Sequence, residues 1–305
     1  MPEITPAARR CGFIALIGAP NAGKSTLVNA LVGAKVAIVT HKVQTTRALV
    51  RGIAIEGSSQ LVLVDTPGIF APKRRLDRAM VTTAWSGAAD ADLVCLLVDA
   101  RRGVDVEIEA ILDRLKEVRH PLVLVLTKVD VVTEKPKLLA LAADLNARLP
   151  FEATFMVAAT TGSGTDELAR WLAGRVPKGP WHYPEDQVSD APLRSLAAEI
   201  TREKLTLRLH EELPYQSTVE TTSWQSRPDG SVRIEQTIFV ARESQRKIVL
   251  GKGGETIKAI SMAARKEIAE AVDATVHLFL FVKVRENWSD DPERYREMGL
   301  DFPRE

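Results

Sequence analysis

Residues 18–26 carry the clearest chemical pattern in the chain, because they read Gly-Ala-Pro-Asn-Ala-Gly-Lys-Ser-Thr. This fits G-x-x-x-x-G-K-[ST], in which the two glycines let backbone N–H groups close around a nucleotide β-phosphate. Lys24 places a positive charge toward the β- and γ-phosphates, and the hydroxyl of Ser25 suits Mg²⁺. The expected phosphate site is formed by nine consecutive residues: Gly18, Ala19, Pro20, Asn21, Ala22, Gly23, Lys24, Ser25 and Thr26.

A second polar group follows an apolar run at 60–64, where Asp65, Thr66, Pro67 and Gly68 have the form D-x-x-G. An Asp at a strand end can hold a Mg²⁺-bound water, and a glycine N–H can meet a γ-phosphate. Asp and Gly are also common turn residues, so this motif alone is weak. At its distance from the phosphate loop it predicts a further part of the same nucleotide site.

The third motif, Thr127-Lys128-Val129-Asp130, ends the apolar run 122–126. The carboxylate of Asp130 can accept two hydrogen bonds from the N1–H and N2–H₂ groups of guanine, while the stem of Lys128 lies along the base. Adenine offers no matching pair of donors. In isolation the motif also fits a surface turn with a capping Asp, but as the third motif in this order it predicts guanine recognition.

These motifs need a scaffold that brings strand ends together. Apolar runs that predict strands lie at 13–17, 48–55, 60–64, 93–98, 122–126 and 154–158, and helical patterns lie at 27–31, 104–118 and 165–175. Continuous apolar strands that alternate with helices indicate a mostly parallel sheet covered on both faces. The expected fold class of this part is therefore α/β.

The second half of the chain has a different order of elements. Residues 177–191 are rich in proline and predict a linker, whose Trp181, His182 and Tyr183 more commonly pack against a neighbouring domain than act as docking anchors. Beyond it, patterns predict a helix at 193–213, strands at 217–222 and 232–240, helices near 244–249 and 256–271, and a strand at 275–284. This α-β-β-α-α-β order predicts a second, α+β domain.

A G-x-x-G loop joins two of these helices. Glycine at both ends lets backbone approach backbone, which would clamp about four nucleotides of a single strand. Residues 242–266 hold seven basic groups against two acidic ones. The predicted RNA contacts are the loop and its neighbouring cations: Gly251, Lys252, Gly253, Gly254, Arg246, Lys247 and Lys258. A helix C-cap followed by a turn is the alternative for this loop.

Composition limits the classes of function. At 305 residues the chain is long enough for two domains. Residues 182–305 carry 18 Lys and Arg against 22 Asp and Glu, which confines any nucleic-acid binding there to a local patch. Cys11 and Cys95 have no partner at metal-ligand spacing and predict buried free thiols in a reducing compartment. With no apolar signal core and no stretch near ~20 apolar residues, we expect a cytoplasmic protein.

Together the motifs carry a family resemblance. The set G-x-P-N-x-G-K-S-T, Q-T-T-R at 44–47, D-T-P-G, T-K-x-D and a final small-residue loop resembles the bacterial GTPases of the Era and tRNA-modification-GTPase branch. The resemblance implies that Thr46 orders on Mg²⁺ and the γ-phosphate. It thereby implies Ser25, Thr46 and Asp65 as Mg²⁺ ligands and Lys24, Thr46 and Gly68 as catalytic residues.

Two positions depart from common GTPase patterns. The final loop, Ala158, Ala159 and Thr160, would contact guanine through its backbone, but Ala158 replaces the usual Ser and removes a supporting hydroxyl. Ile69 stands where signalling GTPases carry a water-orienting Gln. Resemblance to GTPases with an apolar residue there implies slow hydrolysis aided by K⁺, with Asn21 as its ligand. An ordinary turn residue is an equally good interpretation of Asn21.

The second domain resembles the KH RNA-binding module of bacterial type, and the whole chain, including residues 210–215, is similar to the Era family. The expected architecture is a P-loop NTPase with a mixed, mostly parallel sheet, followed by an α+β KH type II domain. The predicted boundaries are a flexible N-terminus at 1–10, a GTP-binding domain at 11–176, a linker at 177–191, a KH domain at 192–288 and an acidic tail at 289–305.

The resemblance implies a GTP-hydrolysing switch that binds the 3′-end region of 16S ribosomal RNA and acts in small-subunit maturation and assembly. GTP or GDP, small-subunit ribosomal RNA and the small ribosomal subunit are then its partners, and we expect a monomer. Family members also contact the inner membrane peripherally, which this composition does not independently support. The alternative is a ribosome-associated GTPase whose second domain docks protein, which Gly251 and Gly254 disfavour. A metabolic phosphotransferase is disfavoured by the guanine motif.

Overall fold

The computed structural model describes residues 9–210, 213–286 and 291–303. Parts of four sequence predictions lie outside these described residues: positions 1–8 of the flexible N-terminus, positions 211–212 of the 193–213 helix, positions 211–212 and 287–288 of the KH domain, and positions 289–290 and 304–305 of the acidic tail. The chain forms two compact units. The first is built mainly from residues 46–190 and also takes in 9–37 and 298–303, whereas the second contains residues 38–45 and the described part of 191–297.

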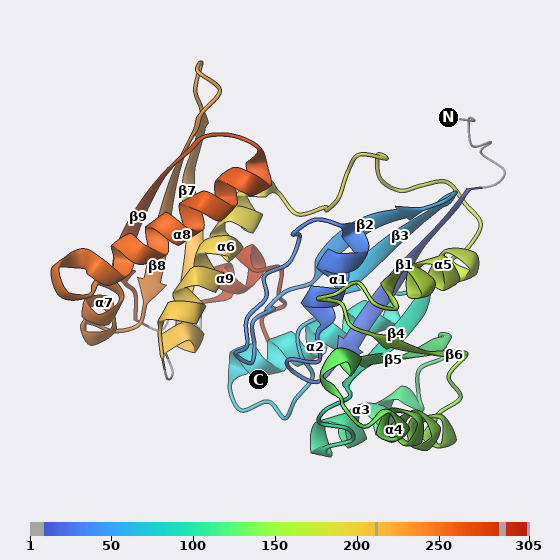
Figure 1. Ribbon diagram of the computed structural model, residues 1–305. Coiled ribbons are helices and arrows are strands. Elements are labelled where there is room, and N and C mark those ends of the chain that lie inside the picture. The colour runs from blue at the N-terminus through green and yellow to red at the C-terminus, as the bar shows by residue number, and fades with distance from the viewer. Residues whose placement is uncertain (1–8, 211–212, 287–290, 304–305) are drawn as a thin grey trace. The chain divides into compact units, whose positions relative to one another are not determined.

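The first unit is organised around a six-stranded sheet. Its strands are β1 (Arg10–Gly18), β2 (Val50–Glu56), β3 (Ser59–Asp65), β4 (Leu93–Asp99), β5 (Leu122–Thr127) and β6 (Ala153–Val157). They lie in the order β2-β3-β1-β4-β5-β6, and only β2 runs antiparallel to its neighbour (Figure 1). Because β1, β3, β4 and β5 are parallel, their carboxyl ends meet at one edge of the sheet.

Five helices cover the two faces of this sheet: α1 (Lys24–Val32), α2 (Arg75–Ala89), α3 (Val106–Leu115), α4 (Lys135–Arg148) and α5 (Thr165–Arg175). Side chains of α1 and α5 share one apolar core with the sheet, and those of α2, α3 and α4 share the other. Every residue of β3, β4 and β5 is buried, which explains why these strands read as continuous apolar runs. The predicted α/β fold with a mixed, mostly parallel sheet is confirmed.

Several helices differ from the sequence prediction. Helix α3 is shorter than the predicted 104–118, and helices α2 and α4 were not predicted. The buried face of α2 relies on small residues such as Ala79, Ala84 and Ala88, and α4 buries only Leu138 and Leu145. A narrow or small-residue apolar face gives little contrast with the polar face, so the helical period is hard to detect.

The second unit has the predicted α-β-β-α-α-β order, which confirms the α+β KH fold. Its elements are α6 (Leu193–Arg208), β7 (Ser217–Ser226), β8 (Val232–Val240), α7 (Glu243–Leu250), α8 (Glu255–Val272) and β9 (Val276–Val284), with a further helix, α9 (Pro292–Glu297), inside the predicted tail. Helix α6 ends five residues before the predicted end at 213. Strand β8 pairs with β7 antiparallel and with β9 parallel, and the apolar cores lie between this sheet and helices α6 and α8.

Residues 177–190, which we call the linker strap, are hydrogen-bonded to the first unit. The N–H of Ile53 in β2 donates to the carbonyl of Val188 at 2.9 Å, and Arg51 pairs with Asp190 at 2.8 Å. Gln60 of β3 bonds to the backbone of His182 and Tyr183. The strap is thus part of the first unit's structure. No helix within the described ranges is long and apolar enough to cross a membrane.

Candidate functional site

The phosphate loop connects β1 to α1 in a conformation that its glycines permit. A Cβ on Gly18 would lie 2.5 Å from the carbonyl oxygen of Leu97, so the loop packs too closely on β4 for any side chain there. Gly23, the N-cap of α1, has a left-handed backbone (φ 92°) and offers no side-chain cap. Because no side chain of Gly23 accepts their hydrogen bonds, the first N–H groups of α1 are available to an anion, as at other phosphate-binding helix N-termini.

Lys24 is a buried cation with only backbone carbonyls as hydrogen-bond partners within the described residues. Its Nζ donates to the carbonyls of Gly18 at 3.1 Å and Ala19 at 3.0 Å. Burial lowers the pKa of Lys24 to about 8, against the opposing attraction of Asp65 and Glu107. An anionic phosphate would relieve this burial cost, because it would bring negative charge into direct contact with the ammonium group.

The three predicted Mg²⁺ ligands come together from three segments of the chain. Ser25 Oγ donates to Asp65 Oδ2 at 2.6 Å, and Thr46 Oγ1 lies 2.9 Å from Ser25 Oγ and 3.2 Å from Asp65 Oδ2. Asp65 is fully buried, and its Oδ1 has no hydrogen-bond partner in the described part of the chain. Burial raises the pKa of Asp65, while the Ser25 hydrogen bond and the Lys24 charge lower it. Two hydroxyls and a carboxylate with an unpaired buried oxygen fit a hard divalent cation.

The D-x-x-G segment packs directly against the phosphate loop. Thr66 Oγ1 donates to the carbonyl of Leu16 at 2.7 Å, and the N–H of Ile69 donates to Gly18 at 3.1 Å. A Cβ on Gly68 would lie 2.8 Å from Pro20, so glycine is required for this close approach. Ile69 itself is only 6% exposed and packs in the apolar core, where it has no means of orienting a water.

The guanine motif is attached to the same loop. Thr127 Oγ1 donates to the carbonyl of Ala22 at 2.7 Å, and Lys128 Nζ donates to that of Asn21 at 2.5 Å. Asp130 follows in an exposed single turn of 3-10 helix, Val129–Val131. Because Thr127 pairs with Val157 across β5 and β6, the 158–160 loop leaves the sheet beside this motif. There the N–H of Ala158 donates to Ser163, and Ala158 is buried.

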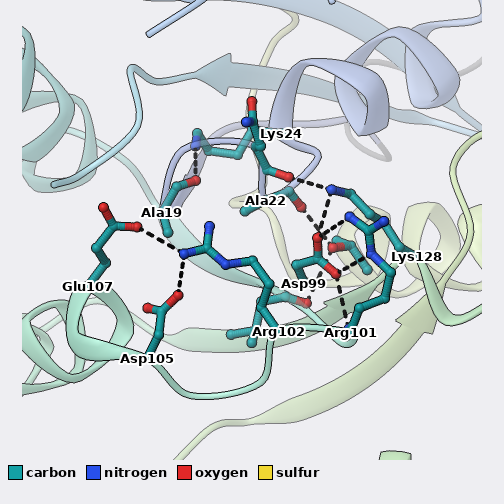
Figure 2. A network of polar contacts seen from close by, with 12 residues as sticks. Ala19, Ala22, Lys24, Asp99, Arg101, Arg102, Asp105, Glu107 and Lys128 are labelled. Atoms are coloured by element: carbon teal, nitrogen blue, oxygen red, sulfur yellow. Dashed lines mark hydrogen bonds and ion pairs between the residues drawn. The ribbon is translucent and has the colours of Figure 1, made fainter. Parts of the chain in front are cut away.

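A carboxylate that no sequence motif identified lies beside the guanine motif. Asp99, at the end of β4, accepts hydrogen bonds from Arg101 and from Lys128 (Figure 2). Arg102 lies nearby and pairs with Asp105 and Glu107 of the α3 start. The available signal was an Asp at the carboxyl end of a buried apolar strand, the position that also carries Asp65.

The second unit contains the other candidate site. Gly251, Gly253 and Gly254 have left-handed backbones with φ of 76°, 62° and 81°, and a Cβ on Gly251 would lie 2.3 Å from Thr256 Oγ1. Lys252 is exposed in the loop, as are Lys247 on α7 and Lys258 on α8. Arg246 differs from these lysines because its guanidinium pairs with Glu243 and donates to the carbonyl of Val282. The loop thus presents bare backbone beside exposed cations, whereas the charge of Arg246 is already paired.

Comparisons with known proteins agree with both sites. A family model described as a 50S ribosome-binding GTPase matches residues 13–128, and the KH domain model matches residues 212–289. Together with the phosphate loop, the D-x-x-G segment and the guanine motif, these matches define a GTPase: a P-loop domain that binds and hydrolyses GTP, joined to a KH domain.

The relatives narrow this class to one family. GTPase Era of Bradyrhizobium sp. strain BTAi1 is 71% identical over 296 residues, covering 97% of this chain and 96% of the relative. Two solved Era structures share 34% identity and a TM-score of 0.90, each covering 95% of this chain and 99% of the other. One is an Aquifex aeolicus variant bound to GDP.AlF4⁻, and the other is a complex with MgGDPNP and nucleotides 1506–1542 of 16S ribosomal RNA. The chain belongs to the Era family of GTPases.

Proposed function

We propose that this GTPase is a nucleotide-controlled switch that binds the 3′-end region of small-subunit ribosomal RNA and acts in maturation and assembly of the small ribosomal subunit. The observation that carries the proposal is the pairing, in one chain, of a nucleotide site with a G-x-x-G loop of left-handed glycines flanked by exposed lysines. The similarity over nearly full length to an Era structure that holds 16S ribosomal RNA supports the choice of RNA.

RNA binding would depend more on close approach to the backbone of the G-x-x-G loop than on the charge of its neighbouring side chains. Gly251 and Gly254 let a phosphodiester strand approach the loop, and Lys252, Lys247 and Lys258 supply local positive potential. Because the unit as a whole is not basic, binding should depend on the presented sequence as well as on phosphate charge. Arg246 should contribute less than the lysines because its guanidinium is paired with Glu243.

Mg²⁺ is part of the proposed GTPase site, with Ser25, Thr46 and Asp65 as the residues that would hold it. When bound, it neutralises charge on the β- and γ-phosphates. The chain's own groups would cradle the phosphates through the α1 N-terminus and place Lys24 beside them, and Gly68 packs against Pro20 of the phosphate loop. These positions support roles for Lys24, Thr46 and Gly68 in hydrolysis.

K⁺ is proposed as the activator that replaces a water-orienting side chain, because Ile69 is held in the core. Asn21 has a left-handed backbone (φ 63°) in the phosphate loop and is its proposed ligand. Exchange of K⁺ for Na⁺ at fixed ionic strength should slow GTP turnover, and Asn21→Ala should remove the difference. Equal turnover of the parent protein in both salts would contradict this part of the proposal.

The RNA assignment is tested by crosslinking in cells followed by sequencing of the bound RNA. Enrichment of the 3′-end region of 16S ribosomal RNA, repeated in gel shifts with the purified chain, is the expected result. Enrichment of no RNA, together with capture of the same ribosomal protein in repeated pull-downs, would instead favour the protein-docking alternative for the second unit.

Location and assembly state complete the proposal. The cytoplasmic location rests on the composition, and the membrane contact rests on the family resemblance alone. We propose a cytoplasmic monomer that contacts the cytoplasmic face of the inner membrane peripherally. Cell fractionation should recover the protein mainly in the soluble and ribosomal fractions, with a membrane portion that salt releases. Light scattering after gel filtration should give the mass of one 33.5 kDa chain.

A further inference from the structure

Asp99 is a buried carboxylate at the end of β4, with an exposure of 5%. Its Oδ1 accepts hydrogen bonds from the backbone N–H and the Nε of Arg101, both at 3.0 Å. Its Oδ2 accepts from Arg101 Nη2 at 2.7 Å and from Lys128 Nζ at 2.8 Å. Arg101 supplies three of these hydrogen bonds, and Lys128 supplies the fourth, so both cations hold the carboxylate.

The Lys128 side chain is fixed at both of its ends. At its root, the Lys128 backbone is left-handed (φ 58°), which directs the side chain away from the path of β5. At its tip, the ammonium lies between Asp99 and the carbonyl of Asn21 in the phosphate loop. The stem between these points is the part expected to lie along the guanine ring. Without Asp99, a flexible four-carbon chain would be held only by one neutral carbonyl.

We propose that Asp99 is a positioning residue for guanine nucleotides: it holds Lys128 in the conformation that receives the base, and Arg101 in turn holds Asp99. Figure 2 shows the three side chains converging beside the phosphate loop. The inference deepens the assignment of GTP binding and does not depend on the RNA partner or on the ribosomal role.

The charge of Asp99 is available throughout the physiological range. Burial raises the pKa of Asp99, but the hydrogen bonds from Arg101 and Lys128 outweigh it and lower the pKa to about 2. A buried carboxylate that stays ionised is a strong acceptor for an ammonium group. Lys128 is only partly exposed, with 30% of its side chain accessible, so solvent only partly weakens the pair.

A double-mutant cycle tests whether Asp99 acts through Lys128. The dissociation constant of GDP is measured by titration calorimetry for the parent, D99N, K128M and the double variant. We expect D99N to weaken GDP binding roughly tenfold in the parent, as for loss of a hydrogen bond to a charged group. In the K128M background the same substitution should change the affinity less than twofold, because its target is gone.

Asp92→Asn is the matched control, since Asp92 precedes the opposite end of β4 and accepts a hydrogen bond from the N–H of Phe13 at 2.7 Å. It removes the same charge from the residue directly before the strand and should leave GDP affinity unchanged. Circular dichroism and urea unfolding establish that each variant is folded. If D99N does not fold, R101Q takes its place in the cycle, with a smaller expected loss that again depends on Lys128.

Equal losses from D99N in both backgrounds, or no loss in the parent background, would overturn the proposal. These outcomes differ from failure of the functional assignment itself. If the parent protein did not bind GDP, the GTPase assignment would be wrong. If the parent binds GDP and the two substitutions are simply additive, only the role of Asp99 is wrong.

Discussion

Binding of nucleotide should be accompanied by uptake of a proton at Lys24. In the nucleotide-free protein, burial lowers the pKa of Lys24 from 10.5 to about 8. A bound diphosphate favours the ammonium form and should restore the pKa toward or above its ordinary value. This difference in pKa corresponds to roughly 3 kcal/mol between the two protonation states.

The sign and size of the effect follow from these two pKa values. At pH 8 about half of the Lys24 side chains are neutral before binding, so about 0.5 proton should be taken up per nucleotide, against about 0.1 at pH 7 and about 0.9 at pH 9. Affinity should fall up to about tenfold per pH unit above pH 8. The nucleotide-free protein should gain stability over the same window, from about pH 8 to 10.5, because its unfolded state binds more protons there.

Titration calorimetry with GDP in buffers of different ionisation enthalpy measures this uptake directly. The experiment is done in EDTA, so that no metal ion binds Asp65, whose pKa burial raises, and displaces a proton from it into the buffer. Glu107→Gln is an informative control, since Glu107 raises the pKa of Lys24. It should move the midpoint of uptake below pH 8. Proton uptake that stays flat or declines between pH 7 and 9 in the parent protein would refute the reasoning.

Three other results are expected. Asp130→Asn exchanges one acceptor for a donor, so nucleotide competition should shift from GTP toward XTP, and an undiminished preference for GTP would show that the motif is wrongly assigned. Gly251→Asp combined with Gly254→Asp should abolish specific RNA binding in gel shifts without changing GTP hydrolysis, whereas Lys252→Ala should reduce the slope of log affinity against log salt by at most about 0.7. Ile111→Ala, at a fully buried position facing the sheet, should lower the free energy of unfolding by about 3 kcal/mol in urea titrations.

The sequence predicted the strands of the first unit well where every residue of the strand is buried. Strands β3, β4 and β5 are buried on both faces, so their composition alone identifies them, and the phosphate loop, the D-x-x-G segment and the T-K-x-D motif lie where β1, β3 and β5 end. Helices α2 and α4 were missed because small or few apolar residues form their buried faces. A period of 3.6 residues is visible only when the buried side is clearly more apolar than the exposed side.

The sequence predicted only those site residues that belong to a motif with a fixed spacing along the chain. Ser25, Thr46 and Asp65 each belonged to a recognisable motif, and the structure brings them within hydrogen-bonding distance. Asp99 belonged to none. Its contact with Lys128 exists because β4 and β5 are adjacent in register, with Asp99 opposite Thr127. Such a contact depends on strand order, which spacing along the chain does not specify.

The linker strap limits where the chain can be truncated to obtain the GTPase unit alone. Strand β2 ends the sheet, and an edge strand with bare N–H and C=O groups invites pairing with other molecules and aggregation. The strap covers part of that edge through the Ile53–Val188 hydrogen bond and the pairing of Gly52 with Ser189. A GTPase fragment truncated at 176 would uncover it, and Gln60 would lose its backbone partners at His182 and Tyr183. A fragment that ends at 190 should therefore remain soluble where the shorter one aggregates.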